Sequence, residues 1–231
     1  VTSDGTDFGD VEVAGGTKDH VFTVTNTGVA TLYLDGATTV AIGGAQSAEF
    51  TLTSGPSQTN VVSGGYVTFT VRFDPAATGL RQANVTISNN DGDEDPYTFD
   101  IQGTGIAPEM GVYSNTTTLA DEDTDPSVAE GTDFGGVGVT YGAVTNTLTI
   151  TNSGTAILYL TGGTLVDITG HTSDFTADTS GITTNIAAGS YTTFKLIFDP
   201  TASGTRTGVV SIANNDSSEN PYNFYIQGTG T

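Results

Sequence analysis

Two runs of alternating carboxylates are the part of the sequence best suited to chemistry. The runs read DGDED and DEDTD, and each places an aspartate at every second position. Their members are Asp91, Asp93 and Asp95 in the first run, and Asp121, Asp123 and Asp125 in the second. Carboxylates at this spacing in a turn can converge on one hard cation, because calcium takes several oxygen ligands. The runs therefore predict calcium as a cofactor, although neither completes the EF-hand pattern. The alternative is a solvated loop in which the aspartates form Asx-turns.

Catalytic groups are poorly represented in the sequence. His20 and His171 are the only histidines, and neither has a counterpart in the internal repeat described below. The motifs HExxH and GxSxG are absent, as is a glycine loop between a strand and a helix that would hold phosphates. We therefore predict a protein that is not an enzyme.

The charge balance narrows the range of partners. The chain has 26 acidic and 5 basic side chains, which gives a net charge of −21 at pH 7. Such a surface repels polyanions, so we expect no nucleic-acid partner. The charge has two explanations, namely solubility and attraction for divalent cations. No apolar run is long enough to span a membrane, and no cysteine is present for disulfides or thiolate metal sites.

The elements that would position these residues are repeated. GTDFGDVEV at Gly5 matches GTDFGGVGV at Gly131, and FTVTNTGVATLYLDG matches LTITNSGTAILYLTG. A third match runs from Tyr66 to Gly105 and from Tyr191 to Gly230. These matches predict two tandem domains of one fold, covering residues 1–106 and 107–231.

Alternation of side chains predicts strands within each copy. In YVTFTVRFDP, Val67, Phe69, Val71 and Phe73 share one face, and polar residues share most of the other. Turn clusters such as NTG and NNDGDEDP separate such runs. This pattern, with abundant glycine and no helical periodicity, predicts an all-β fold of two tandem immunoglobulin-like antiparallel β-sandwiches.

The two equivalent arginines have a structural explanation. Arg81 and Arg206 each follow a turn that begins with Phe-Asp-Pro. We expect each to pair with a carboxylate across that turn, Arg81 with Asp74 and Arg206 with Asp199.

The motifs F.V.NTG, FDP, NND through PY, and IQGTG in combination resemble the bacterial choice-of-anchor D repeat. That family is similar to hydin-like (ASH) and major-sperm-protein-like immunoglobulin-fold domains. The resemblance covers nearly the whole chain twice, and it departs at Ser217 and Ser218, where the first copy has Gly92 and Asp93. It implies non-catalytic β-sandwich modules that occur in tandem in secreted or surface proteins of bacteria.

One segment precedes only the second copy. APEMGVY, beginning at Ala107, is expected to form the first strand of the second sandwich, with Met110 and Val112 on one face. A long acidic loop should follow it. The first copy is expected to lack this strand, either because the chain begins inside a longer array or because a neighbouring chain fills an open edge.

These observations favour a non-catalytic structural module at the cell surface or outside the cell, forming part of a stalk, rod or filament. Its expected partners are neighbouring repeats or identical subunits, in a head-to-tail arrangement. The alternatives are an adhesive or carbohydrate-binding module and an accessory domain of a secreted enzyme. A sugar-binding platform would need exposed aromatic side chains, and the candidates are Tyr33, Tyr113, Tyr141 and Tyr225.

Overall fold

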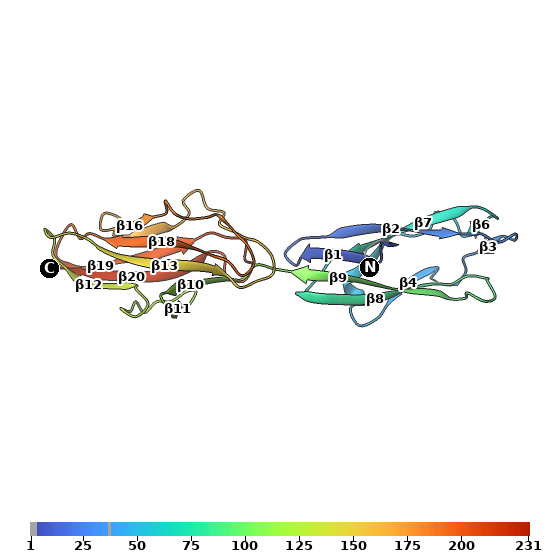
Figure 1. The fold of residues 1–231 in the computed structure, drawn as a ribbon, viewed down its shortest axis with the longest axis horizontal. Coiled ribbons are helices and arrows are strands. Elements are labelled where there is room, and N and C mark those ends of the chain that lie inside the picture. Colours follow the sequence, from blue (N-terminus) through green and yellow to red (C-terminus); the bar gives the residue numbers. More distant parts are fainter. Residues whose placement is uncertain (1–3, 37) are drawn as a thin grey trace. The chain divides into compact units, whose positions relative to one another are not determined.

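The computed structural model describes residues 4–36 and 38–231. The chain divides into two compact units, Val1–Ile106 (unit 1) and Ala107–Thr231 (unit 2). Both units consist of strands joined by turns (Figure 1). The all-β fold of two immunoglobulin-like sandwiches that the sequence predicts is confirmed.

The described residues of unit 1 form nine strands, and the 3-10 helix Ser47–Glu49 lies between the fourth and the fifth. The strands are β1 (Asp7–Glu12), β2 (Lys18–Thr25), β3 (Leu32–Tyr33), β4 (Val40–Gly43), β5 (Phe50–Ser54), β6 (Asn60–Val61), β7 (Tyr66–Phe73), β8 (Gly79–Ile87) and β9 (Tyr97–Ile106). One sheet has the order β1-β9-β8-β4 and the other β2-β7-β5, with β3 and β6 paired separately. Among the described residues, β2 therefore has a strand on one side only.

The core of unit 1 lies between these sheets. The four residues of β7 that the alternation places on one face, Val67, Phe69, Val71 and Phe73, are all buried, as predicted. Gly103 in β9 lies against the ring of Phe73, where any side chain would overlap that ring.

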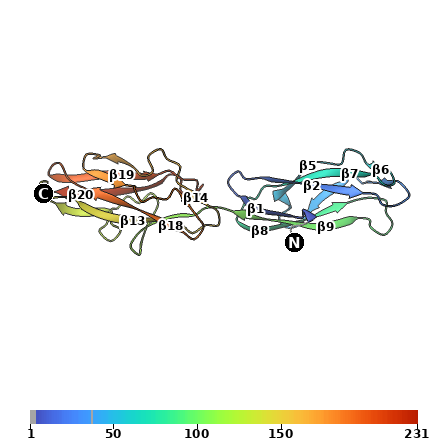
Figure 2. The same cartoon turned by 45° about the horizontal axis from the view of Figure 1, so that its top comes forward.

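Unit 2 contains eleven strands. They are β10 (Met110–Ser114), β11 (Thr117–Leu119), β12 (Asp133–Val137), β13 (Val144–Asn152), β14 (Leu158–Tyr159), β15 (Asp167–Gly170), β16 (Phe175–Asp178), β17 (Asn185–Ile186), β18 (Tyr191–Phe198), β19 (Gly204–Ile212) and β20 (Tyr222–Gly230). Its sheets have the orders β12-β20-β19-β15 and β11-β10-β13-β18-β16. Figure 2 shows β13 beside β18 and β19 beside β20, one pair from each sheet. The second sheet therefore extends two strands beyond its counterpart in unit 1, on the side of β13.

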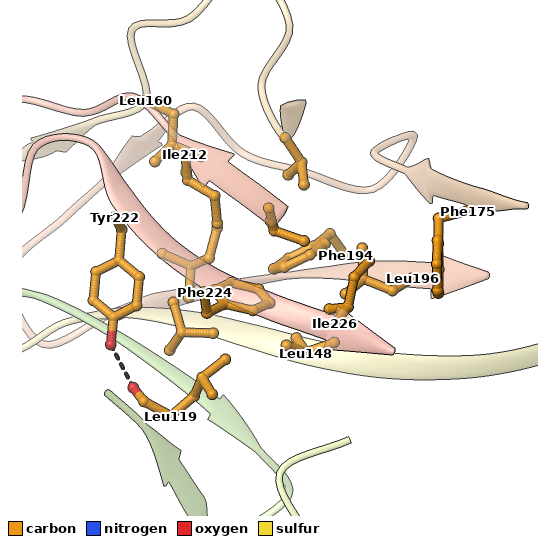
Figure 3. Close-up of a cluster of buried hydrophobic side chains, with 14 of the residues drawn as sticks. Leu119, Leu148, Leu160, Phe175, Phe194, Leu196, Ile212, Tyr222, Phe224 and Ile226 are labelled. Carbon is orange, nitrogen blue, oxygen red and sulfur yellow. Dashed lines mark hydrogen bonds between the residues drawn. The ribbon is translucent and has the colours of Figure 1, made fainter. Parts of the chain in front are cut away.

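The core of unit 2 shows the effect of those two strands. Met110 and Val112 of β10 and Leu119 of β11 are buried together with the side chains of the opposite sheet. Leu119, Leu148, Phe224 and Tyr222 belong to this cluster, in which Tyr222 points toward Leu119 (Figure 3). APEMGVY thus contains the expected strand. The segment after it is not entirely a loop, because Thr117–Leu119 returns along β10 as β11.

One edge strand of each unit is parallel to its neighbour. β1 runs parallel to β9, the last strand of unit 1, and β12 runs parallel to β20, the last strand of unit 2. The repeat alone predicts antiparallel sheets. The difference arises because β1 and β12 each lead into a strand of the opposite sheet, so they lie along the last strand without a hairpin.

No helix in residues 4–36 and 38–231 is long and apolar enough to cross a membrane.

Candidate functional site

An open groove lies beside β2 in unit 1. Its volume is about 560 Å³. Its floor is apolar and its rim carries polar groups; the floor includes Phe22, Val24, Phe69, Ile87 and Phe99, and the rim includes Asn26, Asp91, Glu94 and Tyr97. We call this site the β2 groove. It lies where the two sheets meet at the free side of β2.

The corresponding place in unit 2 is filled by the chain itself. β10 pairs antiparallel with β13, with Met110 opposite Asn152 and Val112 opposite Ile150. The side chains of Met110 and Val112 are 3% and 0% exposed. The space that is open beside β2 is thus occupied, beside β13, by two apolar side chains that lie two residues apart on the same face of a strand.

Polar side chains hold both ends of this inserted segment. The backbone N–H of Glu109 donates to Asn152 Oδ1 at 3.2 Å, and the N–H of Met110 donates to Asp216 Oδ2 at 2.7 Å. At the far end the hydroxyl of Tyr222 donates to the carbonyl of Leu119 (Figure 3). These bonds satisfy backbone groups that burial would otherwise leave unpaired.

Unit 1 has the same residue types at the equivalent positions. By the repeat, Asn26 corresponds to Asn152, Asp91 to Asp216 and Tyr97 to Tyr222. Asn26 is buried, and its side-chain Nδ2 donates hydrogen bonds to the carbonyls of Ala30 and Val61. Asn152 Nδ2 donates in the same way to the carbonyls of Ala156 and Ile186. Tyr97, however, is 49% exposed where Tyr222 is 3% exposed, and Asp91 is exposed where Asp216 is buried. The β2 groove therefore has the side chains that hold a strand, and among the described residues no strand lies in it.

The filled site in unit 2 is acidic. Burial raises the pKa of Glu219 to about 7, and the nearby carboxylates of Asp216, Glu109 and Asp121 add to the shift. Burial also raises the pKa of Tyr222, which keeps its hydroxyl protonated as a donor to Leu119. At this end of the site the chain accommodates carboxyl groups that would repel one another if all were ionised.

The aspartates that predict calcium mostly bond to nearby backbone. In the first run, Asp91 Oδ1 faces the N–H of Asp93 at 3.5 Å, and Asp95 Oδ1 accepts from the N–H of Asn89 at 3.1 Å. Asp93 itself is exposed.

In the second run, Asp123 Oδ1 accepts from the N–H of Asp125 at 2.9 Å, as in an Asx-turn, and Asp121 Oδ1 accepts from the N–H of Asn223 at 2.7 Å. Within residues 4–36 and 38–231, no three His, Cys, Asp or Glu side chains come together in a way that could hold a metal ion. Calcium binding by either run stays a prediction from the sequence.

The histidines and the tyrosines singled out by the sequence are dispersed. His20 Nδ1 lies 2.7 Å from the carbonyl of Gly5, and its ring stacks on Phe8 at a centroid distance of 4.2 Å. In unit 2, His171 Nδ1 contacts the carbonyl of Thr207, which belongs to the same unit. Of the tyrosines, Tyr33, Tyr141 and Tyr225 are exposed and Tyr113 is partly buried.

The prediction that Arg81 pairs with Asp74 and Arg206 with Asp199 is wrong, because each arginine contacts a different carboxylate. Arg81 pairs with Glu49, whose carboxylate also accepts from the N–H of Ala76, and Arg206 lies 3.6 Å from Asp174. Glu49 and Asp174 occupy equivalent positions of the repeat and lie at the start of β5 and β16, far from the arginines in sequence. The predicted partners lie within the local turn, whereas the fold brings a buried carboxylate from a segment distant in the sequence.

Comparisons with known proteins bear on the fold. Residues 1–104 match the family model described as HYDIN/CFA65/VesB-like, Ig-like domain. No curated protein matches the chain.

Several solved structures are similar to the chain. A protein of unknown function from Porphyromonas gingivalis W83 is 13% identical over 94% of this chain and 93% of that one, with a TM-score of 0.39. The C-terminal domain of the Streptococcus agalactiae AgI/II polypeptide BspA is 10% identical over 95% and 94%, with a TM-score of 0.41. The Vibrio cholerae VesB protease is 11% identical over 72% of this chain, which spans 58% of that protein, with a TM-score of 0.35.

The family match covers almost all of unit 1, and unit 2 repeats its sequence motifs and its strand order. The predicted resemblance to hydin-like immunoglobulin-fold domains is confirmed, because residues 1–104 are similar to the HYDIN/CFA65/VesB-like, Ig-like domain.

Proposed function

We propose that this chain is a non-catalytic structural module of a secreted or surface protein of a bacterium, forming part of a stalk, rod or filament. The resemblance to choice-of-anchor D repeats and the family match support a module of this kind. The observation that carries the proposal is the pairing of a parallel edge strand with the last strand of each unit.

This pairing suits a unit that bears load. β1 lies near the start of unit 1 and β9 ends it, and the two strands are parallel and directly paired. A pull on the two ends of unit 1 therefore slides β1 along β9, so that the hydrogen bonds between them are loaded together. These include the bond from Gln102 N–H to the carbonyl of Thr6, and that from Val13 N–H to the carbonyl of Ile106 at 2.9 Å. In an antiparallel hairpin the same pull would open one bond at a time.

The entry to unit 2 is also well held. The carbonyl of Ala107 accepts from the N–H groups of Thr155 and Ala156, at 2.7 and 2.9 Å. Further along, Met110 N–H is bound by Asp216. Load that reaches unit 2 along the chain thus meets hydrogen bonds at its first residue. The acidic surface supports the proposal too, because mutual repulsion keeps neighbouring modules from clumping.

Single-molecule stretching of the chain from its two ends tests this proposal. We expect two discrete unfolding events, one for each unit. Val13→Pro removes the N–H that bonds to Ile106 and should lower the force of the unit 1 event, whereas Val13→Ala keeps that N–H and is the matched control. In unit 2, Val139→Pro and Val139→Ala form the equivalent pair, because Val139 N–H donates to the carbonyl of Thr231.

Gradual extension at low force, without discrete events, would contradict a load-bearing role. So would equal unfolding forces for Val13→Pro and Val13→Ala.

A further inference from the structure

We propose that the β2 groove is an acceptor site for one β-strand of the same type as β10, supplied by another segment of repeat sequence. The occupant would be an extended segment with the pattern of residues 107–119, lying antiparallel to β2. This inference deepens the proposed function, on which it rests for the presence of further repeat segments.

The free side of β2 favours a strand over other ligands. Among the described residues β2 pairs only with β7, so a row of its backbone N–H and C=O groups faces away from any strand. An extended peptide satisfies such a row along its whole length, which is how strand addition to a sheet edge gains both affinity and register.

The floor of the groove matches the apolar face of the proposed strand. Phe22, Val24 and Phe99 are partly exposed in unit 1, and their equivalents Leu148, Ile150 and Phe224 are fully buried under β10 and β11 in unit 2. A strand with two apolar side chains at alternate positions would cover this surface as Met110 and Val112 do.

The pairing observed in unit 2 gives the register. Met110 faces Asn152 and Val112 faces Ile150. Transferred by the repeat, the methionine position of the occupant would face Asn26, and its valine position would face Val24.

The rim of the groove supplies the same fixed hydrogen-bonding groups. Asp91 would accept the N–H at the methionine position, as Asp216 accepts that of Met110 at 2.7 Å. Tyr97 would donate to a carbonyl at the far end, as Tyr222 does to that of Leu119. Both side chains line the groove and both are exposed. In unit 2 the segment that fills the site follows the last strand of unit 1 after three residues, Ala107–Glu109. A strand that follows the last strand of another repeat is therefore the expected occupant.

A labelled synthetic peptide of residues 107–119 tests the proposal in solution with the full chain. We expect saturable binding of one peptide per chain, followed by fluorescence anisotropy. Val24→Asp on the groove side and Asp91→Ala on the rim should each weaken binding at least about tenfold. Val21→Asp, on the solvent face of β2, and Asp93→Ala, beside the groove, are the matched controls and should bind as the original chain does.

A peptide carrying Met110→Asp and Val112→Asp should not bind. Binding that survives both Val24→Asp and Asp91→Ala would overturn the proposal, because it would place the peptide elsewhere, for example in unit 2. Absence of binding by the original peptide would also count against it, unless the fused chain described next shows the effect.

Attaching the strand covalently to unit 1 gives a second test, which does not depend on how tightly a separate peptide binds. In a chain where residues 107–130 replace residues 1–4 ahead of Gly5, the strand is attached as it is in unit 2. We expect the melting temperature of unit 1 to rise, and the same fusion with Met110→Asp and Val112→Asp should leave it unchanged. An unchanged melting temperature with the original strand, together with no peptide binding, would overturn the proposal.

Self-assembly of the original chain tests the alternative occupant. Oligomers that Val24→Asp abolishes, and that the peptide does not compete with, would put a different segment in the groove and overturn the proposal. The stretching experiment uses the chain without any added strand, so its outcome and that of the peptide experiment are independent.

Discussion

Arg81 and Glu49 form a partly buried ion pair that joins the start of β8 to the start of β5. The guanidinium Nε lies 3.0 Å from both carboxylate oxygens, and Nη2 donates to Oε1. The side chains are 21% and 9% exposed. A pair this sheltered leaves a costly unpaired charge when one partner is removed.

We therefore expect Arg81→Ala to destabilise unit 1 by about 3 kcal/mol. The measurement is chemical denaturation of the full chain, following the transition of unit 1. Arg72 and Asp19 provide the matched control, because their pair is bidentate as well but lies in the open, with side chains 43% and 41% exposed. Arg72→Ala should lower the free energy of unfolding much less. Equal decreases in the two variants would show that burial of the ion pair does not determine its contribution to stability.

The same pair gives a prediction in acid. The hydrogen bond from Arg81 holds the pKa of Glu49 below its ordinary value of 4.5. A carboxyl whose pKa is lower in the folded state adds stability that is complete above the unfolded pKa and is lost as the pH falls through the folded pKa. The difference in unfolding free energy between the original chain and Glu49→Gln should thus be constant above about pH 5 and shrink below pH 4.5. A difference that grows in acid would contradict the ion pair.

For Glu219 in unit 2, we expect stability to change with pH in the opposite direction. Burial and the carboxylates of Asp216, Glu109 and Asp121 raise its pKa to about 7, from an ordinary value of 4.5. Its Oε2 is buried and has no hydrogen-bond partner among the residues that the structure describes. The folded state therefore holds a proton that the unfolded chain releases between these two values, so unit 2 loses stability as the pH rises from about 4.5 to 7.

Replacing Glu219 by Gln removes the ionisable group and should flatten this pH dependence. The gain at pH 8 should be on the order of 2 kcal/mol, measured as the shift of the unit 2 transition. Glu94, the equivalent residue of unit 1, is exposed, and Glu94→Gln is the control that should change neither unit. A Glu219→Gln chain with the original pH dependence would assign the titration to other carboxyls.

The glycine of IQGTG gives a packing prediction. A methyl group on Gly103 would overlap the ring of Phe73, and one on Gly228 would overlap the ring of Phe198. Both rings are fully buried in the cores of their units. Gly103→Ala should therefore destabilise unit 1 by about 1–3 kcal/mol. Gly92 lies in an exposed turn, where an added Cβ would meet nothing within 4 Å, so Gly92→Ala is the control and should be neutral by the same thermal unfolding measurement.

Some of these contacts could be predicted from the sequence and others could not. Local alternation was sufficient for the buried face of β7, and comparison of the two copies was sufficient for β10, because Met110 and Val112 have no counterpart before Gly5. Both are properties of neighbouring residues or of aligned segments. The partners of Arg81 and Arg206 are not of this kind, since Glu49 and Asp174 lie just before β5 and β16, 32 residues from their arginines.

The candidate site was predictable only in part for the same reason. Comparison of the two copies identifies APEMGVY as a strand segment of the second copy. It does not indicate that Asp216, Asn152 and Tyr222 hold that strand in the second copy, because the hydrogen bond from Met110 to Asp216 joins residues 106 positions apart. Once those bonds are known, the repeat identifies Asp91, Asn26 and Tyr97 as their equivalents.

Hydrogen exchange offers a direct comparison of the two edges. In unit 2, β13 lies between β10 and β18, so its N–H groups bond on both sides. In unit 1, β2 has only β7 beside it among the described residues, and alternate N–H groups of β2 point toward the groove. We expect every second amide from Phe22 to Thr25 to exchange on the order of 100-fold faster than its equivalent from Leu148 to Thr151. Addition of the peptide of residues 107–119 should slow those amides alone. Uniform protection along β2 in the chain by itself would mean that its outer edge is already paired, and the groove would then not be free to accept a strand.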